Sequence, residues 1–196
     1  MVFTFIFVLK NKKSEKGITL IEILVVIFII ALFSGILVTD FPKIKRQFAL
    51  TRVVHKMSQD LRRAQDMGFS GQWIEGVALK GYGVYIDIRL GSVLGPKKYI
   101  IYADMNEDKK YIAGTDNIIE TIDFGQAEAG VIIDRIMNTK DDQQWVDINF
   151  QPPNPDITIT ELSSGLNRVQ IIFAIESEPL KERMVFVNTS GLIETK

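Results

Sequence analysis

The chain has 196 residues, of which 46% are hydrophobic and 24% charged, with 23 Lys and Arg against 24 Asp and Glu. This is the composition of a globular protein, and it excludes a disordered, collagen-like or low-complexity chain. The absence of cysteine excludes disulfides, thiolate metal sites and a cysteine nucleophile, and the single histidine argues against a multi-histidine metal centre or a histidine-based triad. The net charge of −1 argues against a generally basic nucleic-acid binder.

The amino-terminal region joins a basic segment to a long apolar run. Residues 10–16 contain four lysines and one glutamate, and Gly17 separates them from residues 18–38, whose one charge is Glu22. About 20 apolar helical residues span the core of a bilayer, and lysines before a span favour the cytoplasm for the preceding segment. A cleaved secretory signal would be shorter and would end in small residues. The sequence therefore predicts one membrane span, with the downstream chain crossing out of the cytoplasm.

Glu22 separates a plain anchor from a more specific element. A carboxylate inside a membrane segment costs on the order of a few kcal/mol and usually has a partner, although a plain anchor tolerates one a single turn into the span. Its surroundings are more specific: Lys16-Gly17, then ITLIE, then an unbroken apolar helix. This arrangement resembles the class III signal of type IV prepilins and type II secretion pseudopilins. Ile18 is a mild departure, because the family's first mature residue is most often Phe or Met.

The resemblance implies roles for three residues. A membrane peptidase would cut between Gly17 and Ile18 on the cytoplasmic side and methylate the new amine of Ile18. Glu22 would then pair with the terminal amine of a neighbouring subunit. The implied partners are other pilins or pseudopilins, the prepilin peptidase and the inner-membrane assembly machinery. The implied location is the cytoplasmic membrane, crossed once with an extracytoplasmic carboxy-terminal head, and then a pilus or pseudopilus.

Helical spacing continues beyond the span. Pro42 is expected to kink or interrupt the helix, and after it apolar residues recur every three to four positions between polar ones. This apolar stripe comprises Ile44, Phe48, Thr51, Val54, Leu61 and Ala64. The pattern predicts one long helix over roughly residues 18–68, ended by Gly68 or Gly71. His55 is expected to be solvated or to face the head. The helix also carries basic residues, interpreted as a solvated face or a partner for acidic neighbours: Arg52, Lys56, Arg62 and Arg63.

From about Trp73 the hydrophobic pattern alternates with a period of two, as in strands. Ten strands are expected, at Val77–Lys80, Val84–Arg89, Lys98–Ala103, Ile118–Phe124, Val131–Met137, Val146–Phe150, Ile157–Thr160, Val169–Ile175, Arg183–Val187 and Leu192–Glu194. Their spacing of about ten residues without intervening helices indicates antiparallel pairing. The fold class is therefore α+β and pilin-like, a long amino-terminal helix packed on an antiparallel β-rich head. Four parts are expected: a leader over 1–17, the transmembrane half of the helix over 18–41, its amphipathic half over 42–72 and the head over 73–196.

Several segments of the amphipathic helix and of the head resemble the GspH/FimT group of minor pilins and pseudopilins. They are a helix rich in Arg, Ala and Leu, a GVYI-type early strand, the segment WVDINFQPPNP and the closing segment MVFVNTSGLIE. This resemblance implies a globular head of two sheets. It also implies a low-copy role near the filament tip or in priming assembly.

One loop of the head carries oxygen side chains at alternating positions. Asp104, Asn106 and Asp108 occupy the first, third and fifth places of the loop, and Asp116 follows eight residues later. This spacing can direct three side-chain oxygens to one hard cation, so calcium is a candidate ligand. Lys109 replaces the glycine of the usual tight loop, and a solvated turn is the alternative.

The leading function is thus a structural subunit, a minor pilin or pseudopilin assembled through its apolar helix. The sequence offers no serine in a nucleophile elbow and no distinctive carboxylate pair, so an enzyme is not expected. One alternative is a FimT-like minor pilin that captures DNA for uptake. It is the weaker idea because phosphate binding needs clustered cations, whereas removal of the leader leaves a net acidic chain. The other alternative is a plain membrane-anchored extracytoplasmic binding domain.

Overall fold

The computed structural model describes residues 17–71, 73–74, 77–78, 81–128, 130–152 and 156–196. The expected leader therefore lies outside the described residues, apart from Gly17. The chain forms two compact units, the first ending at Pro42 and the second spanning Lys43–Lys196.

One helix, α1 (Leu20–Ser70), contributes to both units. It confirms the predicted long helix, and it is not interrupted at Pro42, which lies inside it. The helix ends at a glycine: Gly71 adopts a φ of +58°, and its N–H donates to the carbonyl of Gly68 at 3.4 Å. Glycine is favoured at this position because it enters the left-handed region without a Cβ clash. Gly68 itself stays helical, and a Cβ there would lie 2.6 Å from the carbonyl oxygen of Phe150.

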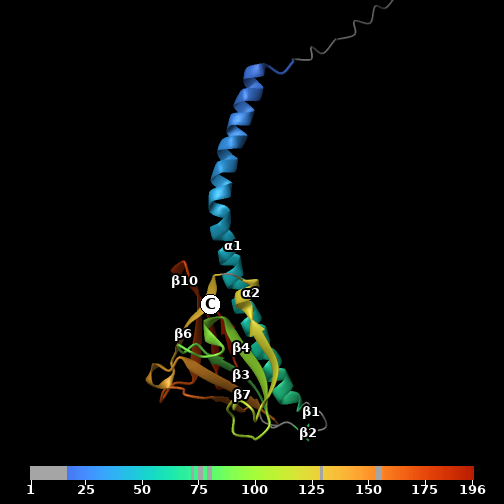
Figure 1. Cartoon of the computed structure of the whole chain (residues 1–196), viewed down its shortest axis with the longest axis vertical. Helices are drawn as coiled ribbons and strands as arrows, with labels where there is room; N and C mark the ends of the chain where they lie inside the picture. Colours follow the sequence, from blue (N-terminus) through green and yellow to red (C-terminus); the bar gives the residue numbers. More distant parts are fainter. Residues whose placement is uncertain (1–16, 72, 75–76, 79–80, 129, 153–155) are drawn as a thin grey trace, which may run out of the picture. The chain divides into compact units, whose positions relative to one another are not determined.

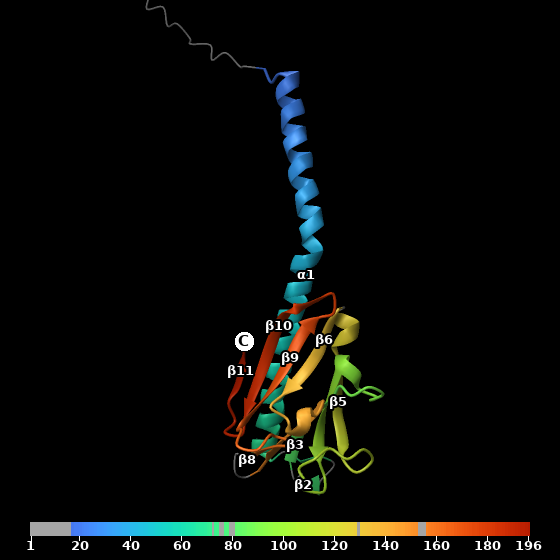
Figure 2. The same ribbon diagram turned by 90° about the vertical axis from the view of Figure 1, so that its left-hand side faces the viewer.

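The second unit contains two main antiparallel sheets, as Figures 1 and 2 show. The larger sheet has the strand order β5-β4-β3-β7-β8. Its strands are β3 (Gly81–Asp87), β4 (Lys98–Asp104), β5 (Asn117–Asp123), β7 (Trp145–Gln151) and β8 (Asp156–Ile159).

The second sheet has four strands in the order β11-β10-β9-β6. They are β6 (Val131–Met137), β9 (Arg168–Ile175), β10 (Glu178–Asn188) and β11 (Ile193–Thr195). Short elements complete the unit: the strand pair β1 (Trp73–Ile74) and β2 (Val77–Ala78), the helix α2 (Phe124–Ala127), and two 3-10 turns, η1 (Gly95–Lys97) and η2 (Lys140–Asp142).

The predicted α+β fold is confirmed. Each of the ten expected strands overlaps an observed strand, and β6 has the expected bounds. The largest difference is in β10, which begins at Glu178, five residues before the expected start. A bulge explains why alternation missed this part: Glu178 pairs with Ile175 and Glu182 with Ala174, which leaves residues 179–181 without partners in β9.

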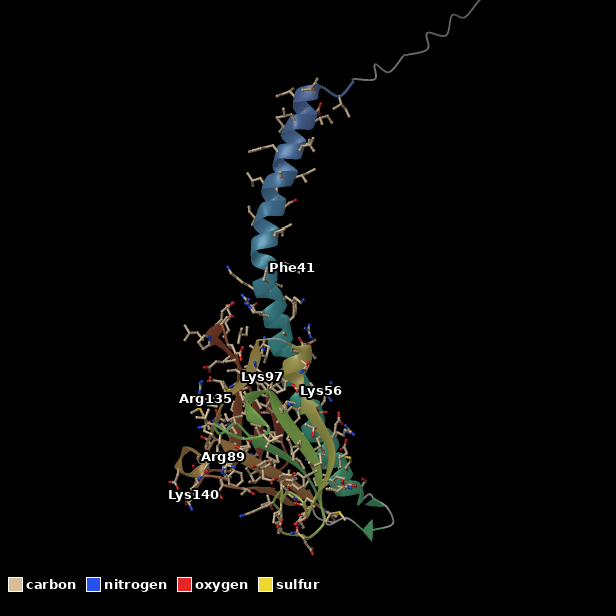
Figure 3. All side chains as sticks on the ribbon, in the orientation of Figure 1. Phe41, Lys56, Arg89, Lys97, Arg135 and Lys140 are labelled. Atoms are coloured by element: carbon tan, nitrogen blue, oxygen red, sulfur yellow. The ribbon has the colours of Figure 1, made fainter. Side chains whose placement is uncertain are left out.

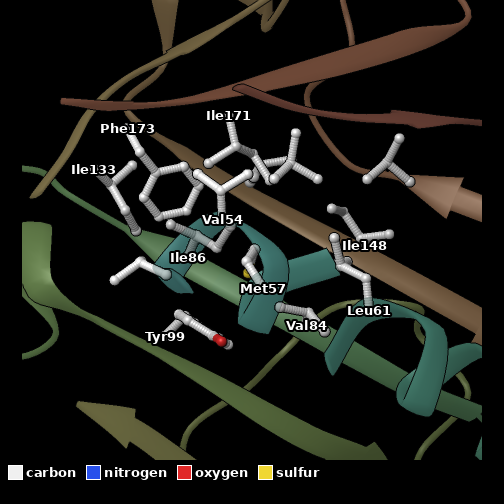
Figure 4. Packing of buried hydrophobic residues seen from close by; sticks show 14 of the residues in the cluster. Val54, Met57, Leu61, Val84, Ile86, Tyr99, Ile133, Ile148, Ile171 and Phe173 are labelled. Atoms are coloured by element: carbon white, nitrogen blue, oxygen red, sulfur yellow. The ribbon is translucent and has the colours of Figure 1, made fainter. Parts of the chain in front are cut away.

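The core lies between the two sheets and one face of α1. Val54, Met57 and Leu61 of α1 are at most 2% exposed, and Figure 4 shows them among side chains of both sheets, such as Val84 of β3 and Phe173 of β9. On β7 and β9 every second residue enters this core, as the period-two pattern requires, whereas a register shift interrupts the alternation on β6.

The predicted apolar stripe was wrong at its first two positions. Ile44 is 48% exposed and Phe48 is 60% exposed, whereas burial on α1 begins at Ala49. The spacing alone identifies a helix face, but it does not tell where along that face the sheets begin to cover it.

A buried ionic group ties α1 to the larger sheet. Asp60 of α1 is 2% exposed, and its carboxylate accepts a hydrogen bond from the hydroxyl of Tyr99 on β4 at 2.6 Å. Lys56 approaches the other oxygen of the same carboxylate at 2.6 Å. Burial, and then the charge of Asp60, raise the pKa of the Tyr99 hydroxyl, which therefore stays a donor.

Candidate assembly site on the amino-terminal helix

Thr19 determines where α1 begins. Its hydroxyl accepts a hydrogen bond from the backbone N–H of Glu22 at 3.3 Å, and its carbonyl accepts from the N–H groups of Glu22 and Ile23. This is the geometry of an N-cap, in which a side chain satisfies one of the free N–H groups of the first turn. Gly17 and Ile18 consequently precede the helix.

Glu22 occupies the third position of the helix. A carboxylate in the first turn is favoured there by the partial positive charge of the helix amino terminus. A Cβ added to Gly17 would meet no heavy atom of the described residues within 4 Å. The predicted cleavage point and the predicted assembly carboxylate therefore stand on either side of one helix start.

The apolar amino-terminal part of α1 is not covered by any described part of the chain. The most apolar 18-residue window has a mean hydropathy of 3.0 and is 0% buried. Figure 3 shows side chains projecting on all sides of this part of α1. A helix that is apolar all round must be covered by lipid or by other helices. By length and composition it can cross a membrane.

The comparisons with known proteins identify the same segment. The family model of the prokaryotic N-terminal methylation motif matches residues 12–38. The chain carries a prepilin-type amino terminus. The match includes Gly17, Ile18 and Glu22, and it supports the type IV pilin and pseudopilin family. No curated protein and no solved structure matches the chain.

Thr19 is one functional residue of this prepilin-type segment that the hydrophobic pattern missed. Thr19 and Glu22 form the Thr-x-x-Glu pattern of a capping box, which marks the start of a helix. The apolar run around them was interpreted as part of the span, so its helix was expected to begin at Ile18. The capping pattern was the signal in the sequence that could have located the helix start, and it places the first helical residue at Leu20, two residues after Ile18.

The structure does not bring the expected calcium ligands Asp104, Asn106, Asp108 and Asp116 together as one cation-binding group. Among the described residues, no group of three or more Asp, Glu, His or Cys side chains is placed to hold a metal ion. The carboxylate of Asp104 accepts the N–H groups of Asn106, Glu107 and Lys109, and that of Asp116 accepts those of Met105 and Ile112. This geometry favours the alternative of a turn over the calcium site.

A third buried carboxylate holds the same loop. Asp147 of β7 is 1% exposed, and it accepts the hydroxyl of Tyr102 at 2.6 Å and the N–H of Tyr111 at 2.5 Å. Burial raises the pKa of Asp147 to about 7, although both hydrogen bonds oppose that rise. The buried amide of Asn149 donates to both Tyr102 and Asp104. Loop 105–116 is therefore fastened to the outer face of the larger sheet by side-chain oxygens.

The four basic residues of α1 named in the sequence analysis form ion pairs or hydrogen bonds within the second unit. Arg52 forms an ion pair with Glu128, and the same contact lowers the pKa of that carboxyl. Paired or hydrogen-bonded cations have fewer free donors for phosphate. The remaining contacts are Arg63 with Glu120, Lys56 with Asp60, and Arg62 with the carbonyl of Ile193. His55 is exposed, in agreement with a solvated role.

Proposed function

We propose that this protein is a minor pilin or pseudopilin, a structural subunit of a type IV pilus or of a type II secretion pseudopilus. The observation that carries the proposal is the methylation motif, which matches the amino-terminal part of α1, where the most apolar 18-residue window is 0% buried inside the described chain. A plain anchor accounts for the apolar run. It does not account for the methylation motif.

Processing is the first step of the proposed mechanism. The leader, residues 1–17, is removed by a prepilin peptidase, and the new amine of Ile18 is methylated. Because Thr19 caps the helix, Ile18 lies outside the hydrogen-bonded helix and its amine is free to reach another chain. The expected mature protein has three parts. Residues 18–41 form the transmembrane half of the helix, residues 42–72 its amphipathic half, and residues 73–196 the head.

Assembly is the second step. Apolar helices leave the bilayer and pack against one another, and Glu22 neutralises the amine of Ile18 of the next subunit. In a dry setting an ion pair fixes the register, because removal of one partner leaves an uncompensated charge that costs about 3–5 kcal/mol. The partners proposed are therefore other pilins or pseudopilins, the peptidase and the inner-membrane assembly machinery. The two-sheet head agrees with the GspH/FimT group, in which we place the protein by pattern.

The test is a Glu22→Val variant, with Glu194→Val as a matched control on an exposed position of β11. Valine in place of Glu22 improves the membrane span, so insertion and cleavage after Gly17 should survive. Mass spectrometry should find methylated Ile18 as the amino terminus in wild type and in both variants. Glu22→Val should accumulate in the membrane and be missing from sheared filaments or tip complexes, while Glu194→Val is incorporated as wild type is.

Two results would contradict the proposal at different steps. Mature protein that retains residues 1–17 in a host with an active prepilin peptidase would remove the processing step. Incorporation of Glu22→Val at the wild-type level would show that Glu22 is no assembly carboxylate.

A further inference from the structure

The second unit has one end that is close to the proposed membrane span by chain length alone. The unit begins at Lys43, and Arg46 is four residues beyond Pro42. Four residues reach at most about 14 Å even when fully extended. Arg46 therefore lies near the bilayer surface, whatever angle the chain takes at Pro42. This step rests on the span that the proposed function requires.

Arg46 holds the β9–β10 hairpin at that end. Its guanidinium lies 3.2 Å from Glu178, and the ammonium of Lys181 lies 2.6 Å from the second oxygen of the same carboxylate. Leu180 lines a shallow groove together with Gln47 of α1. Figure 2 shows the turn between β9 and β10 beside α1. The hairpin tip is therefore tied to the first turns of α1 in this unit.

The opposite end of β10 is fixed much farther along α1. The side chain of Gln65 donates to the carbonyl of Gly191 at 3.2 Å. Between Arg46 and Gln65 a helix rises about 28 Å, at about 1.5 Å per residue. Leu192, in the turn after β10, is 53% exposed. The two ends of β10 thus carry one exposed leucine each, one beside the first turns of α1 in this unit and one about 28 Å farther along the same helix.

The end near the span exposes more apolar surface than a solvated end requires. The bulge at residues 179–181 carries Leu180 out of the ladder, and its side chain is 97% exposed. On the adjoining turns of α1, Ile44 and Phe48 are 48% and 60% exposed. These three side chains leave apolar surface at one end of the head available for a contact.

The same end carries an excess of cations. Residues 43–48 contain three cations and no carboxylate, and residues 176–183 contain two cations and three carboxylates. Two of those carboxylates are engaged by cations outside these segments, Glu176 by Lys97 and Glu182 by Arg135. The whole chain, in contrast, has a net charge of −1. A basic surface with apolar side chains is complementary to an anionic lipid surface.

We propose that this end of the head, formed by Ile44, Phe48, Leu180, Lys45 and Lys181, rests on the anionic surface of the bilayer that the chain itself spans. Leu180 inserts at the boundary between headgroups and acyl chains. Lys45 lies among the lipid phosphates, and Lys181 faces them with the two N–H donors that its ion pair with Glu178 leaves free. The contact holds the head against the membrane before assembly. Departure of the helix into a filament removes the head from this surface.

The experiment uses the full-length chain, which has no cysteine, so that one introduced thiol takes a label at one place. Leu180→Cys carries an environment-sensitive fluorophore, and Leu192→Cys is the matched control on the remote end of β10. Each protein is reconstituted at low density into vesicles of phosphatidylcholine with phosphatidylglycerol. Quenching by spin-labelled lipid and by aqueous iodide is measured. The label at position 180 should be quenched by lipid and protected from iodide, and the label at 192 should show the reverse.

Charge supplies a second readout. Removal of one cation by Lys181→Gln should weaken the surface contact by about fivefold in anionic vesicles, since each cation near such a surface contributes about 1 kcal/mol. The same substitution should have little effect in pure phosphatidylcholine. Unchanged lipid quenching in anionic vesicles after Lys181→Gln would overturn the electrostatic half of the proposal.

Three further results have separate meanings. Iodide access at position 180 equal to that at 192, in protein that floats with vesicles after alkaline extraction, overturns the surface contact alone. Failure to float overturns the span, and with it both this inference and the proposed function. Protection at 180 that disappears on dilution of protein in lipid identifies a second copy of the chain as the occupant and overturns the lipid assignment.

Discussion

The two units of the chain bury apolar side chains in opposite ways. In the first, the most apolar window of α1 is 0% buried, and a capped helix start carries Glu22 at its third position. In the second, Val54, Met57 and Leu61 of the same helix are buried in a core that the helix forms with the two sheets. One element thus completes its packing inside the chain at one end and needs lipid or other subunits at the other.

The difference teaches how a subunit can change its surroundings without unfolding. Hydrophobic burial is non-directional and depends on the area removed from water, so lipid and neighbouring helices satisfy the first unit equally well. The core of the second unit is closely packed, so each buried side chain has neighbours that are determined by shape. Under the proposed function, this half can therefore move from bilayer to filament while the head keeps its fold.

The largest expected difference between the two units is in how much one apolar side chain contributes to the stability of the head. Met57→Ala should lower the free energy of unfolding of the head by about 2–5 kcal/mol, because Met57 is fully buried and a cavity remains. Leu32→Ala, at a position 49% exposed in the first unit, should leave that free energy unchanged. Urea unfolding of the full chain in detergent, followed by near-ultraviolet circular dichroism, measures both. Equal losses in the two variants would contradict the division into independent units.

The next effect concerns the ionic link between α1 and the larger sheet. Tyr99→Phe removes the hydroxyl that donates to the buried Asp60, and a hydrogen bond to a charged group contributes about 1.5–3 kcal/mol. Tyr85→Phe is the matched control, because its hydroxyl donates to Asp87 at 3.2 Å in a partly exposed place where Arg89 also holds the carboxylate. The loss should be clearly larger for Tyr99. A smaller loss for Tyr99 than for Tyr85 would show that the link to α1 does not stabilise the head.

Much of this architecture could be predicted from the sequence, and the reasons are local. Alternation along β9 predicted a strand with nearly the observed bounds, because Val169, Ile171, Phe173 and Ile175 all enter the core. In β6 the bounds were predicted although a register shift lies between Ile133 and Arg135, because apolar residues flank it on both sides. The start of β10 was missed because a bulge breaks its period at Leu180. The Tyr99–Asp60 contact joins residues 39 positions apart, and no local pattern carries such a pair.

The candidate site shows the same limit. Gly17, Ile18 and Glu22 could be named because their signal is contiguous, and the family match covers that segment. The loop at Asp104 was interpreted by its spacing alone. Spacing predicts which side-chain oxygens can approach one cation. It does not predict that backbone N–H groups donate to the Asp104 carboxylate, because those contacts form only in the folded loop.

A further effect concerns pH and belongs to the head alone. Asp147 has a folded pKa raised by burial to about 7, above the ordinary aspartate value of 3.8. Between those values the folded state binds more protons than the unfolded state, so stability should fall as pH rises from about 4 to 7 and then level off. The steepest slope is about 1.4 kcal/mol per pH unit.

The comparison of wild type with Asp147→Asn isolates this slope, because the variant has no carboxyl to titrate at position 147. The raised pKa of Asp104 acts in the same direction and remains in both proteins. The lowered pKa of Asp87 acts in the opposite direction, and only below its ordinary value. Urea midpoints measured from about pH 4.5 to 8 should therefore be flatter for the variant. An identical pH profile in the two proteins would rule out titration of Asp147 in this range.

The smallest expected effect is that of calcium on the loop between β4 and β5. A cation that binds only the folded state raises stability by RT ln(1 + [L]/Kd), so binding with a Kd of about 10⁻³ M or tighter should raise the melting temperature in millimolar calcium. Asp104 and Asp116 already accept five backbone N–H bonds, and a cation would have to displace them. We therefore expect melting curves of the full chain in detergent to coincide in calcium and in chelator. A higher melting temperature in calcium, lost in an Asp108→Asn variant whose fold in chelator matches wild type, would establish the cation site and show that this loop, like the first unit, is completed from outside the chain.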